Sequence, residues 1–203
     1  MDKMPWPREP LPVGSAGKRS GGWHGVLATI LTEGALFGYL LFSYYYLASQ
    51  MQQPWPPHGL PKLAMASLNT AILLISSVFV WGCERCIRKR KLRLGLLLLA
   101  VAIMLGIGFV LLQVRDWHNK PYGMTSNLYG SLYFTITGFH IAHVVVGLFI
   151  LLLLLMWTAL GYFDERRHAA LTIGGVYWHF VDVVWLLVFT TFYLTPYLGL
   201  GGR

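Results

Sequence analysis

The sequence predicts an all-α membrane protein: a bundle of five transmembrane helices with its N-terminus in the cytoplasm and its C-terminus outside. Hydrophobic residues make up 56% of the 203 residues and charged residues only 12%, whereas a soluble domain carries roughly 25% charged residues. The apolar residues form five runs, each long enough to cross a hydrocarbon core of about 30 Å as a helix. Unbroken runs favour helices over a barrel, whose strands alternate in polarity.

The five runs follow one another through short connections, which indicates a single domain. We predict a polar, Pro- and Gly-rich arm over residues 1–22, a transmembrane domain over 23–197 and a short tail over 198–203. The run after the arm is too long for the core of a secretory signal peptide. The predicted spans are Trp23–Ala48, Leu63–Gly82, Leu94–Val114, Tyr129–Trp157 and Leu171–Leu194.

Basic residues are divided unequally between the two sides of the membrane that five spans define. The arm and the second and fourth connections hold 12 of the 16 basic residues, and the opposite side holds 4. Basic residues gather on the cytoplasmic side of membrane proteins, so this distribution predicts a cytoplasmic arm. The run "RKRKLR" (Arg88–Arg93) is interpreted as a cluster that contacts lipid headgroups. The same distribution argues against a nucleic-acid partner for the net charge of +8.

Cys83 and Cys86 form a single Cys-x-x-Cys pair near the end of the second span. A structural zinc site needs about four ligands, and the sequence holds no second cysteine pair. A redox dithiol is the other use of this spacing, but its neighbours do not resemble a thioredoxin turn. We interpret the two thiols as inert.

Glu33 lies about ten residues into the first span, where a charged group costs about 2.5–3.5 kcal/mol on insertion. Gly34 and Gly38 follow at a small-xxx-small spacing, which predicts close approach of another helix. We therefore expect the carboxyl group to face neighbouring helices rather than lipid. Two roles stay open: a packing carboxyl that ties two helices together, and a proton-relay or gating carboxyl.

His140 and His143 lie three residues apart in the fourth span and project from one helix face. They supply only half of a metal site, and a haem is usually held between helices. The other interpretation is a pair of neutral histidines, each hydrogen-bonded to a neighbouring group such as Glu33.

His179 and Asp182 lie three residues apart in the fifth span, on the same helix as Trp178 and Trp185. A shared hydrogen bond would lower the cost of burying the histidine and the aspartate. The two tryptophans then act as anchors at the membrane interface. A proton path through the pair is the alternative. The sequence contains no nucleophile with a base, no phosphate-binding glycine loop and no complete metal set, so we predict no catalysis by this chain alone.

Five stretches together resemble one known family. The two most specific are "TGFHIAHVVVGLFIL" and "YWHFVDVVWLLVF" in the last two spans, and the others are "LTEGALFGYLLFSYYY", "SLNTAILLISS" and "GFVLLQVRDW". In this order they resemble subunit III of the haem–copper respiratory oxidases, the cytochrome c oxidase subunit III family, in its five-helix bacterial form. The resemblance extends from about Trp23 to Tyr197.

The resemblance implies a non-catalytic subunit of an aerobic terminal oxidase in the bacterial inner membrane. Such a subunit packs on subunit I, has subunit II and others as further partners, and supports proton uptake and stability of the complex. Haems and copper are expected in the partner subunits, none in this chain, and phospholipid in a cleft. Glu33, His140 and His143 match the buried glutamate and the histidine pair of the family, and we expect them at the cleft. His179 and Asp182 match the last signature.

Several alternatives stay open from the sequence. Subunit III of a quinol oxidase and the related protein associated with nitric oxide reductase share the five-helix outline. A small b-type cytochrome would use His140 and His179 as haem ligands, and a proton channel would use Glu33, His143 and Asp182. The longer family members have two additional first helices that help to enclose the cleft, and whether another subunit supplies them here stays open.

Overall fold

The computed structural model describes residues 21–52, 54–57, 59–163 and 168–198. Residues 1–20 and 199–203, which include most of the predicted arm and tail, lie outside the described residues. Within the described part, five helices are long and apolar enough to cross a membrane, which confirms the predicted number and type of the spans. They are α1 (Gly21–Gln50), α2 (Leu63–Arg88), α3 (Leu92–His118), α4 (Leu128–Ala159) and α5 (Ala169–Phe189).

The helices extend beyond the apolar runs that predicted them. α2 continues from the predicted end at Gly82 to Arg88, and α3 continues from Val114 to His118. These extra turns carry polar and basic side chains, which hydropathy does not assign to a span. Basic residues in the last turn of a helix interact favourably with its dipole. α5 is followed by a π-helical turn, Thr190–Leu194, and a 3₁₀ turn, Thr195–Leu198.

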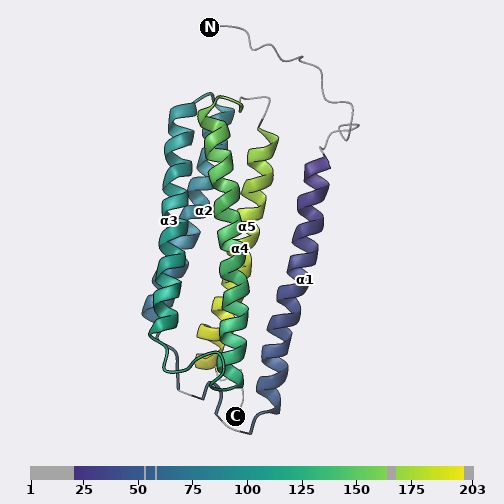
Figure 1. Cartoon of the computed structure of the whole chain (residues 1–203), viewed down its shortest axis with the longest axis vertical. Coiled ribbons are helices and arrows are strands. Elements are labelled where there is room, and N and C mark those ends of the chain that lie inside the picture. Colours follow the sequence, from purple (N-terminus) through teal and green to yellow (C-terminus); the bar gives the residue numbers. More distant parts are fainter. Residues whose placement is uncertain (1–20, 53, 58, 164–167, 199–203) are drawn as a thin grey trace.

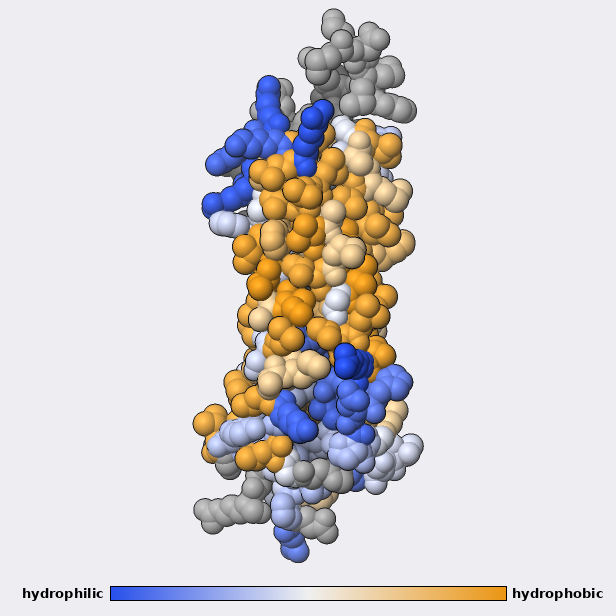
Figure 2. Space-filling view, turned by 90° about the vertical axis from the view of Figure 1, so that its left-hand side faces the viewer, coloured by the Kyte–Doolittle hydropathy of each residue, from blue (hydrophilic) through white to orange (hydrophobic). Residues whose placement is uncertain are grey.

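α2, α3, α4 and α5 form a four-helix bundle, and α1 lies beside α5 and α4 (Figure 1). One end of the molecule, here called the α2–α3 end, holds the start of α1 and the turn between α2 and α3 (Figure 1). The opposite end, here called the α3–α4 end, holds the α1–α2 and α3–α4 loops and the end of α5. Side chains between these two ends form a continuous hydrophobic band on the face shown in Figure 2.

α1 packs on the bundle mainly through its second half. Its buried residues there are Phe37, Leu41, Tyr44 and Ala48, about one per helical turn, whereas Val26 is the only buried residue before them. The spacing of three or four residues places the four side chains on one face. The first half of α1 therefore leaves space between itself and the bundle.

Trp178 and Trp185 of α5 lie in the centre of the bundle, with 0% and 1% of their surfaces exposed. The indole nitrogen of Trp178 donates to the Ser76 hydroxyl at 3.1 Å, and that of Trp185 donates to the Thr70 hydroxyl at 2.9 Å. The interpretation of these residues as anchors at the membrane interface is therefore wrong. Both indoles instead join α5 to α2, since hydroxyl groups of α2 satisfy their only donors.

Two glycines of neighbouring helices make room for Trp178. A Cβ atom added to Gly106 of α3 would lie 2.9 Å from the indole, and one added to Gly147 of α4 would lie at the same distance. No side chain fits at such separations without displacing the ring. α3 and α4 can therefore approach α5 closely where the largest side chain is buried.

Candidate functional site

Glu33 of α1 and His143 of α4 form a pair between the two helices. The Nε2 atom of His143 lies 3.0 Å from Oε2 of Glu33. The Nδ1 atom of the same ring lies 2.7 Å from the carbonyl oxygen of Phe139, which can only accept, so Nδ1 carries a proton. Either Glu33 donates to a neutral imidazole, or an imidazolium donates to a carboxylate. The pair has no net charge in either form, which lowers its cost inside a membrane.

A cavity of about 600 Å³ lies between α1, α4 and α5, and Glu33 and His143 form part of its wall. The rest of the lining is mostly apolar and includes Val26, Ile150, Leu154 and Ile173. The volume falls within the roughly 300–1,000 Å³ that is typical of ligand pockets. The predicted carboxyl–histidine contact is confirmed, and it faces a space that suits an apolar ligand.

His140 does not reach this cavity. Its ring is fully buried, and neither nitrogen has a hydrogen-bond partner among the described residues. The rings of Phe37, Phe109 and Trp185 surround it at centroid distances of 6.4, 5.8 and 5.0 Å. The expectation that both histidines bond to neighbours holds only for His143. The close aromatic packing also leaves no room for a haem on the His140 ring.

The expected close approach at Gly34 and Gly38 is not made within this chain. A Cβ atom on Gly34 would meet the Phe180 ring at 3.9 Å, an ordinary contact distance, and one on Gly38 would meet no atom within 4 Å. The small-xxx-small spacing is real, but Gly38 is exposed. Its face of α1 is therefore open to whatever surrounds the bundle.

His179 and Asp182 of α5 do not form the predicted hydrogen bond. The Nδ1 atom of His179 instead hydrogen-bonds to the Ser77 hydroxyl of α2. Asp182 is buried, with 4% of its surface exposed, and neither of its oxygens has a hydrogen-bond partner among the described residues. The prediction failed because the Ser77 hydroxyl on α2, rather than Asp182 on α5, is the hydrogen-bond partner of the His179 ring.

The α2–α5 interface carries a further polar contact nearer the α2–α3 end. The Oε1 atom of Glu84 accepts from the Thr172 hydroxyl at 2.8 Å and from Nη2 of Arg88 at 2.6 Å. Polar groups thus join these two helices at Glu84, and again at Ser77 and His179. Hydrogen bonds between membrane helices are worth about 0.6 kcal/mol on average.

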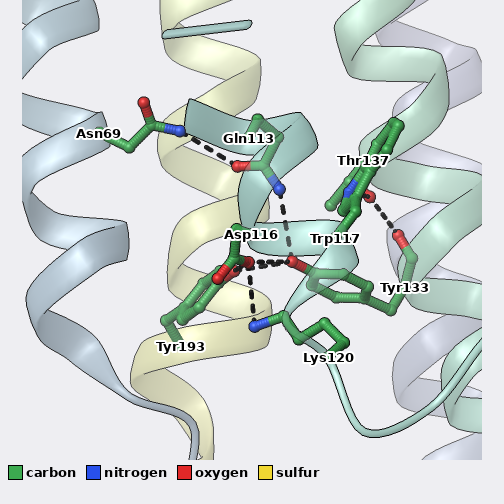
Figure 3. Close-up of polar contacts among 8 residues, drawn as sticks. All are labelled: Asn69, Gln113, Asp116, Trp117, Lys120, Tyr133, Thr137 and Tyr193. Atoms are coloured by element: carbon green, nitrogen blue, oxygen red, sulfur yellow. Dashed lines mark hydrogen bonds and ion pairs between the residues drawn. The ribbon is translucent and has the colours of Figure 1, made fainter. Parts of the chain in front are cut away.

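A polar network at the α3–α4 end was not predicted from the sequence (Figure 3). The Oδ2 atom of Asp116 accepts from the hydroxyls of Tyr133 and Tyr193 at 2.9 and 3.3 Å, and Nζ of Lys120 lies 3.0 Å from it. The two tyrosine oxygens lie 2.9 Å apart. Asp116 therefore joins α3 to α4 and to the π-helical turn after α5.

The network continues into the bundle through Gln113, whose side chain lies between Asn69 and Tyr133 in Figure 3. Its Nε2 atom donates to the Tyr133 hydroxyl at 3.3 Å, and its Oε1 atom accepts from Nδ2 of Asn69 at 3.1 Å. Next to this network, the indole nitrogen of Trp117 donates to the Thr137 hydroxyl at 3.1 Å. A signal was present in the sequence, because positions 113, 116 and 120 share one helix face.

Tyr122 lies in the loop between α3 and α4, outside the predicted spans. Burial raises the pKa of its hydroxyl to about 12. Its ring contacts those of Tyr129 and Tyr133 at centroid distances of 5.5 and 5.9 Å. The loop is thus held against the end of the bundle by aromatic packing.

No group of three or more His, Cys, Asp or Glu side chains that could hold a metal ion occurs in the described ranges of the chain. Cys83 is buried and Cys86 is partly buried, and both thiols are free. The described polar groups are suited to joining helices and lining a cavity.

The fold and the site together define a helical, multi-pass membrane protein whose polar side chains lie between its helices. A family model described as cytochrome c oxidase subunit III matches residues 16–197. Because the match covers most of the sequence, this chain belongs to the cytochrome c oxidase subunit III family.

Curated relatives agree with this assignment. A protein named cytochrome c oxidase subunit 3 from the hagfish Myxine glutinosa is 33% identical over 177 residues, which cover 84% of this chain and 68% of the relative. The protein of the same name from the cyanobacterium Thermostichus vulcanus is 31% identical over 173 residues, with coverages of 84% and 85%. The human protein of that name is 30% identical over 177 residues, with coverages of 84% and 68%.

Proposed function

We propose that this chain is the non-catalytic subunit III of an aerobic haem–copper cytochrome c oxidase in a bacterial cytoplasmic membrane. It packs against subunit I, with subunit II and further subunits as neighbours, and the partner subunits carry the haems and copper. Membership of the subunit III family is the observation that carries this proposal. The names of the curated relatives favour the cytochrome c branch over the quinol oxidase and nitric oxide reductase alternatives.

Within the complex, the cavity between α1, α4 and α5 holds phospholipid acyl chains. Its mostly apolar lining and its volume of about 600 Å³ support this role. Glu33 and His143 add a polar group to the wall without adding net charge. The bound lipid then fills the space that the first half of α1 leaves open.

In this proposal the α2–α3 end faces the cytoplasm, because it carries the Arg88–Arg93 cluster. The subunit supports proton uptake by subunit I by keeping the complex in its active arrangement. Glu33, His140, His143, His179 and Asp182 are the polar residues within the spans through which it does so. Glu33 and His143 join α1 to α4, while His179 joins α5 to α2.

The test is a pull-down of the tagged chain in mild detergent, followed by a reduced-minus-oxidised absorbance spectrum of the eluate. We expect haem bands that arrive with a large, oxygen-consuming partner and leave when the partner is stripped away. Haem that stays with the isolated chain, or a tagged chain that recovers no haem-containing partner, would contradict the proposal.

A further inference from the structure

A second cavity, of about 500 Å³, lies at the α3–α4 end of the bundle. One of its walls is the α1–α2 loop, through Pro56, Gly59, Leu60 and Pro61, and another comes from the end of α3 and the loop after it. Ligand pockets typically measure about 300–1,000 Å³. This cavity shares no lining residue with the one between α1, α4 and α5, so it is a different site.

Contacts with the rest of the bundle hold the loop wall in place. The carbonyl oxygen of Pro61 accepts from the hydroxyl of Tyr197, in the 3₁₀ turn after α5, at 2.7 Å. The Trp55 ring contacts the Tyr129 ring of α4 at a centroid distance of 5.2 Å. Because the prolines restrict the backbone further, the wall is formed before a ligand arrives, which lowers the entropic cost of binding.

The charged groups of the lining are Lys62, Lys120 and Asp116, which give the cavity a net charge of +1. The Asp116 carboxylate is already engaged by Lys120 and by the hydroxyls of Tyr133 and Tyr193 (Figure 3). The Lys120 ammonium lies 5.1 and 5.4 Å from the centres of those two tyrosine rings, which fixes its position. It has three N–H donors, and Asp116 takes one of them. A fixed cation with two remaining donors therefore lines the cavity.

Lys62 supplies the other positive charge, and its side chain has no hydrogen bond or ion pair among the described residues. Asn119 adds an exposed amide group from the end of α3. Both lysines and this amide are N–H donors, and charged N–H donors make their strongest hydrogen bonds with oxyanions. A cationic ligand would instead meet two ammonium groups. The polar part of the lining therefore suits an anion.

Most of the other lining residues are apolar and come from several elements. Leu60 and Pro61 lie in the α1–α2 loop, Met65 in the first turn of α2 and Pro121 in the α3–α4 loop. Leu60 has 58% of its surface exposed, so part of this apolar surface is uncovered in the chain by itself. A small inorganic anion would bind the lysines and leave it in water. The complete lining fits a molecule that joins an oxyanion to an apolar group.

We propose that this cavity binds an organic oxyanion, a phosphate monoester or a carboxylate with an apolar group attached. The oxyanion lies between the ammonium groups of Lys62 and Lys120, and Asn119 also donates to it. The apolar group packs against Leu60 and Met65. A free organic anion from the water phase and an acidic phospholipid of the adjacent leaflet share this chemistry. The site uses residues of this chain alone and does not depend on the oxidase function.

The test is acetylation of lysines by acetic anhydride, read by mass spectrometry, on the full-length chain in phosphatidylcholine nanodiscs. A bound anion shields an ammonium group, so octyl phosphate should slow the acetylation of Lys62 and Lys120. Lys91, in the α2–α3 turn at the opposite end, is the internal control, and its rate should not change. We expect half-protection at a concentration about tenfold lower for octyl phosphate than for inorganic phosphate, because only octyl phosphate buries apolar surface.

Lys62→Gln removes the charge of a side chain that has no partner among the described residues, so the fold should be unaffected. One exposed ion pair contributes up to about fivefold to affinity. The octyl phosphate concentration that half-protects Lys120 should therefore rise about fivefold in Lys62→Gln and recover in Lys62→Arg. Arg115→Gln is the matched control: this exposed arginine lies at the same end but does not line the cavity, so the concentration should not change.

Three results would show that the proposal is wrong. The first is that Lys62 and Lys120 are not protected, or are protected no more than Lys91. The second is half-protection by inorganic phosphate at the same concentration as octyl phosphate, which would mean that the apolar surface takes no part. The third is an equal effect of Lys62→Gln and Arg115→Gln, which would reduce the binding to general attraction between charges.

The source of the ligand is read from a second set of nanodiscs, which contain phosphatidylglycerol. If this lipid occupies the cavity, Lys62 and Lys120 should already be protected relative to Lys91 before octyl phosphate is added. If their rates match those in phosphatidylcholine, the ligand is a free organic anion. Both results uphold the site and the class of its ligand.

Discussion

The Nε2 atom of His143 lies 3.0 Å from Oε2 of Glu33, while Nδ1 of the same ring donates to the carbonyl oxygen of Phe139. Both histidine nitrogens are thereby engaged, and the ring orientation is fixed from its own helix. Because Nδ1 keeps its proton, the contact with α1 depends on a single proton shared between an imidazole and a carboxyl group. This contact connects α1 to α4 at the wall of the cavity.

Replacing Glu33 by alanine should destabilise the protein by about 1–3 kcal/mol, because Nε2 of His143 loses its partner. Glu33→Gln should retain more stability, since an amide can donate to a neutral imidazole. Thermal unfolding of the detergent-purified chain measures both effects. Thr29→Ala is the matched control: this residue lines the same cavity, and its hydroxyl bonds to the carbonyl oxygen of Gly25 of its own helix.

Under the proposed function, the oxidase with Glu33→Ala should also lose activity sooner during sustained turnover. Equal stability of all three variants and the wild type would contradict this account.

Gly147→Ala should destabilise the bundle by about 1–3 kcal/mol, because the new methyl group would lie 2.9 Å from the Trp178 ring. Gly138→Ala on the same helix is the control, since a Cβ atom there meets nothing within 4 Å. That change should leave stability unchanged or raise it by up to about 1 kcal/mol. The thermal midpoint should fall for Gly147→Ala and should stay the same or rise for Gly138→Ala. Matching midpoints would show that Trp178 is not closely packed against α4.

Asp116→Asn should loosen the α3–α4 end, because the negative charge that holds Lys120 and the two tyrosine hydroxyls is removed. The expected loss is about 1–3 kcal/mol, because hydrogen bonds to a charged group are stronger than those to a neutral amide. Tyr193→Phe removes the longer of the two hydroxyl contacts to Asp116 and the contact with the Tyr133 hydroxyl, but it keeps the charge and should cost less. Limited proteolysis of the α3–α4 loop, read by mass spectrometry, measures the local effect. If Asp116→Asn is cleaved no faster than Tyr193→Phe, the aspartate is not the centre of the network.

Tyr122 should make stability depend on alkaline pH. Its pKa is raised to about 12 in the folded protein from an ordinary value of 10.0, so folding favours the protonated hydroxyl. The stability that the protonated Tyr122 hydroxyl contributes is fully present below pH 10 and is lost as the pH rises from 10 to about 12. The Tyr122→Phe variant should lose less stability over this range than the wild type does. Chemical denaturation at pH 9, 10 and 11 gives the free energy of unfolding of both proteins as a function of pH. Equal slopes for the two proteins would mean that folding does not shield the Tyr122 hydroxyl from water.

The orientation proposed from the charge distribution can be tested with single cysteines. In a background of Cys83→Ala and Cys86→Ser, we expect Met124→Cys in the α3–α4 loop to react with a membrane-impermeant maleimide added to intact cells. Lys91→Cys in the α2–α3 turn should react only after the membrane is opened. The reverse pattern would place the α2–α3 end outside.

The spans and the Glu33–His143 contact could be predicted from the sequence for clear physical reasons. A run of about 20 apolar residues is typical of a helix that crosses the membrane. A carboxyl group inside such a helix needs a polar partner, because an ionised group is costly in hydrocarbon. Hydropathy missed the last turns of α2 and α3, because polar residues there extend a helix beyond the hydrocarbon.

Partner choice between helices was harder to predict. His140 and His143 share a helix face, yet His143 bonds to the Glu33 carboxyl, whereas His140 packs against the rings of three aromatic residues. His179 bonds to Ser77, a residue 102 positions earlier, and bypasses Asp182 on its own helix. Spacing along one helix identifies neighbours on that helix but does not say which side chain of another helix competes for them.

α1 packs closely against the bundle through its second half, whereas its first half is joined to α4 by the Glu33–His143 pair. The Tyr44 ring contacts Phe192 at a centroid distance of 4.7 Å, and the Tyr45 hydroxyl lies 3.1 Å from that of Thr191. These contacts hold α1 at the α3–α4 end, and the Glu33–His143 pair holds it again at the wall of the cavity. The width of the cavity therefore depends on the contacts that α1 makes at both places.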